Sequence, residues 1–358
     1  MRWLSRRLAT TRRADDERGS AVVVVLLCFT AFFAMGAVVV DVAALVQERR
    51  VLQNGADAAA LAIAAQCGTG DCADTETIAF TYADANADDA VTTVEEICGS
   101  GIPGYADCAA PPELPDGANY VAVTTTTETT DGGTEVPFGF ARFLGIDGAS
   151  VSARSVAAWG GPSSLTSALP LTISECEYNA YTNSGAALEA PPPYDDGYPE
   201  NEAVIYLHDT TGASPCPSGG SGADLPGGFG WLETSDDCNA TSDIDNWFGD
   251  STGRPPPTSC TAALMASIVG TIVAVPIFDQ TNGLTGTNGV YHMSGYAAFY
   301  VTGYSIVGQY KVASLATGIV PCNGQASCIS GYFVNAPAPV TGSIGGPSMG
   351  VTVVVLVA

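Results

Sequence analysis

The sequence has very few basic residues after its first fifty positions. Residues 51–358 hold thirty-two acidic and four basic side chains, a net charge of −28, against −25 for the whole chain. The four bases are Arg142, Arg154, Arg254 and Lys311. Such an acidic region repels nucleic acid and anionic headgroups. We therefore expect no nucleic-acid partner, and we interpret the excess charge as serving solubility.

Histidine is equally scarce, and the sequence contains no C-x-x-C pair. The two histidines, His208 and His292, lie far from any cysteine pair at metal-ligand spacing. A nucleophile elbow G-x-S-x-G is also missing, because in "HMSGY" His292 stands where the first glycine before Ser294 is needed. We therefore expect a non-enzymatic protein without a metal site or a small-molecule substrate, and we interpret both histidines as strand residues that pack.

The acidic stretch Asp236 to Asp250 offers the one alternative to a chain without cofactors. Its sequence, "DDCNATSDIDNWFGD", gathers five Asp and two Asn near Cys238. Oxygen ligands suit calcium, but Trp247 stands where the EF-hand spacing needs a ligand. We interpret the stretch as a solvated acidic loop and keep calcium as the alternative.

Charged residues are absent from one long apolar run, Ala21 to Val40. Its twenty residues cover about 30 Å as a helix, the thickness of the hydrocarbon core of a bilayer. A cleaved signal has a shorter apolar centre followed by an A-x-A element, which is missing here. Six arginines precede the run, which predicts a cytoplasmic N-terminus. We expect a basic cytoplasmic tail over 1–18, a transmembrane helix over 19–41 and an extracytoplasmic remainder.

The cysteines indicate disulfides. Cys28 lies in the apolar run, and an even number of ten cysteines lies in the region expected outside the membrane. Neighbouring cysteines suggest local pairs, while four others fall in the loop-rich middle and leave the connectivity open. The candidate disulfide cysteines are Cys67, Cys72, Cys98, Cys108, Cys176, Cys216, Cys238, Cys260, Cys322 and Cys328.

Periodicity after the apolar run predicts an α+β fold. Apolar and small residues recur near one helical face up to Gly68, so the transmembrane helix continues outside the membrane. Strands are expected at 119–130 and 149–159, with short helices at 75–90 and 136–147, which makes a small α+β region over 42–160. The stretch "GGPSS" (160–164) predicts a boundary. A β-rich, loop-rich, disulfide-linked domain is expected over 161–358, with strands at 169–174, 203–208, 267–278, 295–310 and 351–358.

The N-terminal region combines a basic flank that ends in Arg-Gly, the apolar run, an Asp directly after it, and then "ERRVLQNGADAAALA". The residues of this motif are Arg18, Gly19, Asp41, Arg50, Leu52, Gln53, Asn54, Ala56, Asp57, Ala58, Ala59, Ala60 and Leu61. The motif resembles the Tad-type N-terminal region of TadE/TadG-like Flp pilus-assembly proteins, which reads "ERR-x-LQN-x-ADAAALA" after a membrane helix, and two looser stretches, 140–157 and 273–304, resemble the actinobacterial type. Prepilin-like members are cleaved after a glycine with a glutamate five residues on, but Val24 occupies that place after Gly19, so we expect no processing.

The resemblance implies a membrane-anchored structural or assembly component of a Tad/Flp-type pilus or secretion system. Its expected partners are the bilayer and other Tad/Flp components. Two alternatives remain open, a surface adhesin or ligand-binding ectodomain and an anchored extracellular hydrolase. The hydrolase would need a nucleophile with a base, or paired acids, at recognisable spacing, and the sequence offers neither.

Overall fold

The computed structural model describes residues 16–87, 91–207, 216, 228–234, 237–249, 255–282, 290–306, 310–324, 326–338 and 342–357. The chain folds into two compact units. The first unit comprises Met1–Ala56, Phe80–Glu95 and Thr124–Arg154, and the second comprises Asp57–Ala79, Glu96–Val123 and Ser155–Ala358. The architecture is a long apolar helix followed by β-sheets with several disulfides, which confirms the α+β prediction.

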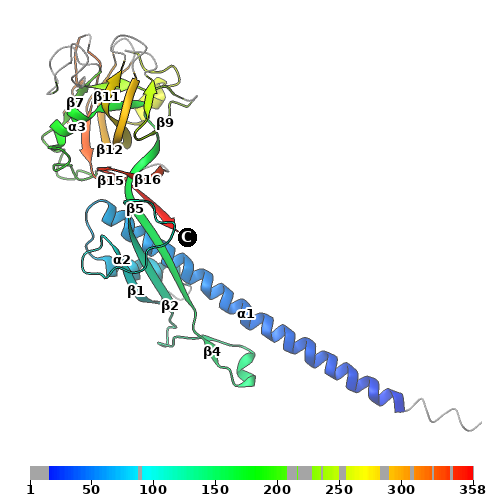
Figure 1. Cartoon of the computed structure of the whole chain (residues 1–358). Coiled ribbons are helices and arrows are strands. Elements are labelled where there is room, and N and C mark those ends of the chain that lie inside the picture. The colour runs from blue at the N-terminus through cyan, green and yellow to red at the C-terminus, as the bar shows by residue number, and fades with distance from the viewer. Residues whose placement is uncertain are drawn as a thin grey trace, which may run out of the picture. The chain divides into compact units, whose positions relative to one another are not determined.

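Helix α1 runs without a break over Asp16–Gly68 and is the first element in Figure 1. Its 53 residues span about 80 Å. Within the part of the chain that the structure describes, it is the one helix long and apolar enough to cross a membrane, with a mean hydropathy of 2.8 in its most apolar window. That window has no buried residue, so the apolar run fits a single-pass membrane anchor. The predicted end at Gly68 is confirmed.

The continuation of α1 beyond Asp41 is buried along one face. Ala56, Ala59, Ala60 and Ala64 have no exposed surface, and Ile63 is 1% exposed. Small side chains let other backbones approach a helix closely, which explains why the Ala-rich segment forms part of a core. The chain itself therefore covers the face that the sequence predicts to be packed.

Two larger sheets follow, and their strand orders are non-sequential. The seven-stranded sheet has the order β1-β2-β5-β18-β15, with β16 and β9 also paired to β5. The nine-stranded sheet has the order β7-β14-β12-β11-β6-β8, with β10, β13 and β17 also paired to β12. A two-stranded pair, β3-β4, belongs to neither sheet. The bounds are β1 Thr92–Ser100, β2 Asn119–Thr127, β3 Val136–Pro137, β4 Gly148–Ala149, β5 Ser152–Ser167, β6 Leu171–Ser174, β7 Ala203–Tyr206, β8 Phe229–Trp231, β9 Ala240–Asp243, β10 Trp247–Gly249, β11 Ile272–Asn282, β12 Val290–Ser305, β13 Lys311–Val312, β14 Cys328–Val334, β15 Ala336–Pro337, β16 Gly342–Gly346, β17 Ser348–Met349 and β18 Val351–Val357.

Short helices accompany these strands, of which α2 lies between α1 and β1. They are α2 Thr75–Asn86, the 3₁₀ helix η1 Ala141–Leu144, α3 Glu175–Thr182 and α4 Ala262–Ser267. Helices α3 and α4 begin at side-chain caps, because Ser174 accepts the N–H of Glu177 and Thr261 accepts the N–H of Leu264.

The core of the second unit is built on the long strand β12. It pairs antiparallel with β11 and β14, and its aromatic side chains are buried on both faces of the sheet. Tyr296 and Phe299 have no exposed surface, and Tyr304 is 1% exposed. The aromatic run between 291 and 304 is therefore a core strand rather than an open platform for carbohydrate.

All ten cysteines outside the apolar run are paired. The pairs are Cys67–Cys72, Cys98–Cys108, Cys176–Cys216, Cys238–Cys260 and Cys322–Cys328. The expected local pairs are confirmed, and the connectivity of the middle four, which the sequence leaves open, is now assigned. Cys28 is a free cysteine in α1.

One local prediction was wrong. Residues 136–147 do not form one amphipathic helix but a short hairpin, β3–β4, that carries η1 at its tip. The stretch 160–164, which the sequence predicts as a boundary, lies within β5, which continues to Ser167. A Cβ at Gly161 would lie 2.3 Å from the carbonyl oxygen of Pro347, so the glycine there permits a close strand contact instead of a turn.

Candidate functional site

The Asp41 side chain holds a hairpin that lies about a hundred residues further along the chain. We call residues Val136–Ala149, which comprise β3, η1 and β4, the aromatic finger; it is the hairpin labelled β4 in Figure 1. The Oδ1 atom of Asp41 accepts the N–H of Gly139 at 2.8 Å, and its Oδ2 atom accepts the N–H of Ala141 at 2.7 Å. The N–H of Phe140 lies 3.2 Å from both oxygens.

Asp41 thus caps a helix to which it does not belong. The residue before η1, Phe140, offers no side-chain cap, and the first N–H groups of a helix have no partner within it. A carboxylate at this end satisfies these donors and interacts favourably with the partial positive charge there. Asp41 is only 6% exposed, so the finger removes it almost completely from solvent.

A groove of about 480 Å³ runs between α1 and the finger, and its walls are almost entirely apolar. On α1 it extends from Thr30 to Leu45. The finger contributes Phe138, Phe140, Ala141 and Phe143. Phe143 is 78% exposed and Ile146 is 54% exposed, so the tip of the finger presents large apolar side chains to its surroundings.

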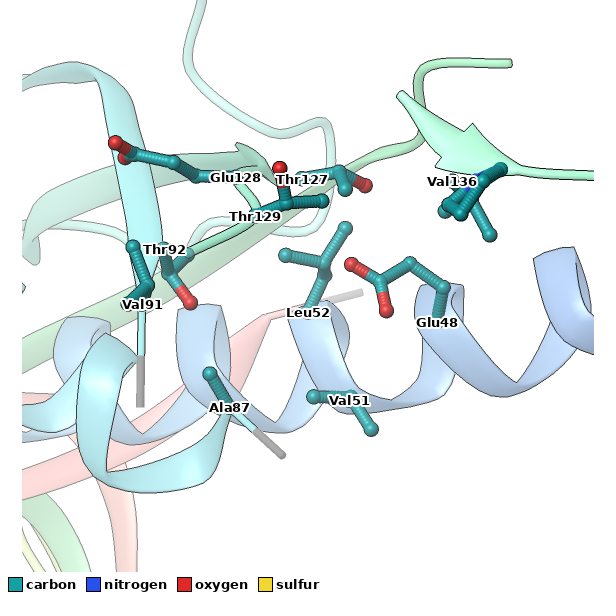
Figure 2. Close-up of a pocket in the computed structure, with 11 residues that line it drawn as sticks. Glu48, Val51, Leu52, Ala87, Val91, Thr92, Thr127, Glu128, Thr129 and Val136 are labelled. Atoms are coloured by element: carbon teal, nitrogen blue, oxygen red, sulfur yellow. The ribbon is translucent and has the colours of Figure 1, made fainter. Parts of the chain in front are cut away.

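A second, smaller pocket of about 190 Å³ lies further along α1 (Figure 2). Figure 2 shows Glu48 and Leu52 projecting from α1 toward Thr127 and Thr129. Glu128 points away from the helix, and its carboxylate accepts the hydroxyl of Thr93 at 2.6 Å. Glu48 is therefore the carboxylate that borders the pocket on the helix side.

The family-motif residues of α1 divide into buried and exposed groups. The carbonyl of Leu52 accepts the hydroxyl of Thr125 at 3.0 Å, and the side-chain amide of Gln53 donates to the carbonyl of Arg154 at 3.3 Å. Leu52, Ala56, Ala59 and Ala60 are buried; Asp57, Ala58 and Leu61 are half-buried; Arg50 and Asn54 are exposed. Arg18 and Gly19 lie near the start of α1.

Sequence reasoning missed one paired acid and base. The Nδ1 atom of His292 lies 2.6 Å from the Oδ1 atom of Asp279, and the Trp247 ring is 5.2 Å from the imidazole between centroids. The pair joins neighbouring strands, and the histidine packs on an aromatic ring as expected. The nearby Ser294 hydroxyl donates to the Ile277 carbonyl at 3.3 Å, so this hydroxyl is engaged by the backbone.

The acidic stretch that carries the calcium alternative is described only in part. Among the described residues, no three His, Cys, Asp or Glu side chains gather as a metal site would require. Both ends of the acidic stretch, Asp236 and Asp250, lie outside the described residues, as does His208. In the described part of the stretch, the backbone N–H of Asp245 donates to the carbonyl of Met293.

A tyrosine cluster in the second unit is packed and not open. Tyr194, Tyr198, Tyr300 and Tyr332 pack together, with ring centroids 5.4–6.5 Å apart. Two of the hydroxyls are engaged by the backbone: Tyr332 donates to the Pro199 carbonyl and Tyr194 to the Ala190 carbonyl. Burial, followed by neighbouring tyrosines and carboxylates, raises the pKa values of Tyr194, Tyr300 and Tyr332 to about 12.

Comparisons with known proteins identify only the N-terminal region. Residues 19–66 match a family described as "Putative Flp pilus-assembly TadE/G-like". No curated protein and no solved structure matches the chain. The matched segment contains the apolar run, Asp41 and the motif residues up to Ala60 and Leu61, and it supports a role related to pilus assembly.

Proposed function

We propose that this protein is a membrane-anchored, non-catalytic component of a Tad/Flp-type pilus or secretion assembly. The family match of residues 19–66 supports this proposal, as does the continuous helix that joins the apolar run to a disulfide-linked ectodomain. The six arginines before the run favour a cytoplasmic N-terminus, and Val24 favours an anchor that remains uncleaved.

The observation that carries the proposal is the exposed face of α1 just beyond Asp41. Val46 is 46% exposed, and Arg49 and Arg50 are exposed. These positions are spaced as i, i+3 and i+4, so they share one side of the helix. The buried motif residues, such as Leu52 and Ala59, explain the fold of this chain, whereas the exposed face serves a partner. We assign that partner to another component of the same assembly.

Substitution of Val46 by Glu tests this assignment. We expect Val46→Glu to abolish co-purification with the assembly components while membrane retention and the five disulfides stay intact. Leu315→Glu is the matched control, because Leu315 is also 46% exposed but lies in the second unit. If Val46→Glu co-purifies with the assembly components as well as Leu315→Glu and the wild-type protein do, the proposal is overturned.

A further inference from the structure

We propose that the aromatic finger is a second membrane contact, and that its tip inserts into the outer leaflet beside α1, with lipid acyl chains filling the groove between them. This inference rests on one part of the proposed function, namely that α1 crosses a bilayer. All the residues that it uses belong to the first unit.

The first argument is depth. The uncharged run ends at Val40, so Asp41 marks the level at which the hydrocarbon core ends. Asp41 holds the backbone of residues 139–141 at this level. The groove then follows α1 back to Thr30, eleven residues or about 16 Å toward the centre of the bilayer. Its apolar walls therefore lie at the depth of the acyl chains.

The second argument is the hydrogen bonding of the finger. Polar backbone groups enter an apolar medium only when they have partners. The N–H groups of residues 139–141 are taken by Asp41. The N–H of Phe138 donates to the Asp147 carbonyl, that of Phe143 to Phe140, that of Gly145 to Arg142 and that of Ile146 to Ala141. Seven N–H groups of this nine-residue tip are thus satisfied, which a loop facing water does not require.

The third argument is the side chains. Phe140 is 47% exposed, Phe143 is 78% exposed and Ile146 is 54% exposed, and these exposed apolar side chains cluster on one short hairpin. Arg142 stands among them with its guanidinium carbon 5.5 Å from the Phe143 ring centre. It is one of only four bases after position 50. Aromatic and basic side chains at the end of a membrane helix are the usual anchors of the interface.

These observations favour lipid over a second protein as the occupant. The groove is continuous with the exposed surface of the apolar run, which a bilayer would already surround. The ectodomain is strongly acidic, so the attraction is apolar and does not depend on anionic lipid. A bilayer of zwitterionic lipid is therefore sufficient to test it.

The test uses the full-length protein in phosphatidylcholine vesicles, with the photo-crosslinking residue p-benzoyl-phenylalanine placed at one position at a time. Phe143 is the test position. Phe33, 75% exposed in the apolar run, is the positive control. Tyr82 on α2 is the negative control, because it lies far from the apolar run. Its neighbour Ala83 packs next to Gly55, and Gly55 lies about 20 Å beyond Asp41 along α1. Adducts are identified by mass spectrometry after disulfide mapping confirms each fold.

We expect lipid adducts at Phe143 and Phe33 and none at Tyr82. Lipid adducts at Phe33 together with only protein dimers, or no adduct, at Phe143 would overturn the finger proposal and leave the anchor intact. An absence of lipid adducts at Phe33, with loss of the protein from alkaline-washed vesicles, would overturn the anchor and the finger together. Lipid adducts at Tyr82 as strong as those at Phe143 would show unspecific contact and would also overturn the finger.

Discussion

Asp41 shows how one side chain connects two segments that are distant in the sequence. It is the first charged residue after the apolar run Ala21 to Val40. Here its two oxygens accept three consecutive backbone N–H groups of the finger. Hydrogen bonds to a buried, charged acceptor are stronger than those between neutral groups, so this residue controls the position of the finger.

Replacing Asp41 by Ala should therefore release the finger. Its three donors would lose a charged acceptor, at a cost of about 2–3 kcal/mol. We expect amide hydrogen exchange at residues 139–141 to become roughly 30–100-fold faster in the full-length protein in micelles. Asp147→Ala is the control, because Asp147 lies on the same finger with an exposed side chain. Unchanged exchange in Asp41→Ala would contradict the assigned role.

The buried tyrosines predict how the second unit responds to alkali. Burial raises the pKa values of Tyr194, Tyr296, Tyr300 and Tyr332 from 10.0 to about 12. A raised folded-state pKa means that the unfolded chain loses these protons first, so stability is complete below pH 10 and is lost as the pH rises toward 12. We expect tyrosinate absorbance in this window to rise together with loss of structure.

A single substitution measures the contribution of one tyrosine to the pH dependence of stability. Tyr300→Phe should reduce the dependence of unfolding free energy on pH by up to about 1.4 kcal/mol per pH unit within the same window. Tyr82→Phe, at an exposed position of α2, should leave the slope unchanged. Complete and reversible tyrosine ionisation in a chain that stays folded would contradict the prediction.

At the scale of elements, local sequence patterns predicted a helix or strand correctly where the segment's own residues determine its structure. The end of α1 at Gly68 and the strands β2, β5 and β18 follow from helical spacing, alternation and glycine signals within each segment. The finger did not follow, because "VPFGFARFLGID" has apolar spacing that also suits a helix. Its N–H groups at residues 139–141 are bound by Asp41, which lies about a hundred residues away in the sequence and gives no local signal.

Only part of the candidate site could be predicted, because its contacts join residues that are distant in the sequence. Asp41 is identifiable from its place after the apolar run and from the family motif, but its partners are backbone groups without a sequence signal. The Asp279–His292 pair was missed because strand register decides that these two side chains meet. The strand β14 was missed because "CISGYFV" begins directly at a disulfide cysteine and lacks clear alternation, being buried on both faces.

The contact between α1 and α2 depends on a glycine of the motif segment. A Cβ at Gly55 would lie 3.3 Å from both the Cα and the carbonyl oxygen of Ala83. We expect Gly55→Leu to displace α2 and to destabilise the protein by about 1–3 kcal/mol. Thermal unfolding in micelles provides the measurement. Gly36→Leu is the matched control, since no atom lies within 4 Å of a Cβ at that glycine of the same helix. Equal melting temperatures for the two variants would contradict this packing.

At the scale of the whole molecule, the protein combines a strongly acidic region, residues 51–358, with many irregular connections. Self-repulsion and loop entropy both favour unfolding of such a chain. Five disulfides oppose this, and they close loops of very different length, from a separation of 5 residues at Cys67–Cys72 to 40 at Cys176–Cys216. The long-loop pair restricts the unfolded chain most.

Removing individual disulfides should therefore cost stability in the order of loop length. Loop-closure entropy predicts a loss of about 4 kcal/mol for Cys176→Ser with Cys216→Ser, and about 2 kcal/mol for Cys67→Ser with Cys72→Ser. Each double variant adds no unpaired cysteine to that of the native chain, Cys28 in the apolar run, so the two variants can be compared directly. Denaturant unfolding of the full-length protein, followed by the fluorescence of the buried Trp231, measures both losses. An equal loss for the two variants, or a larger loss for the short loop, would show that local packing around each disulfide, and not chain entropy, determines its contribution.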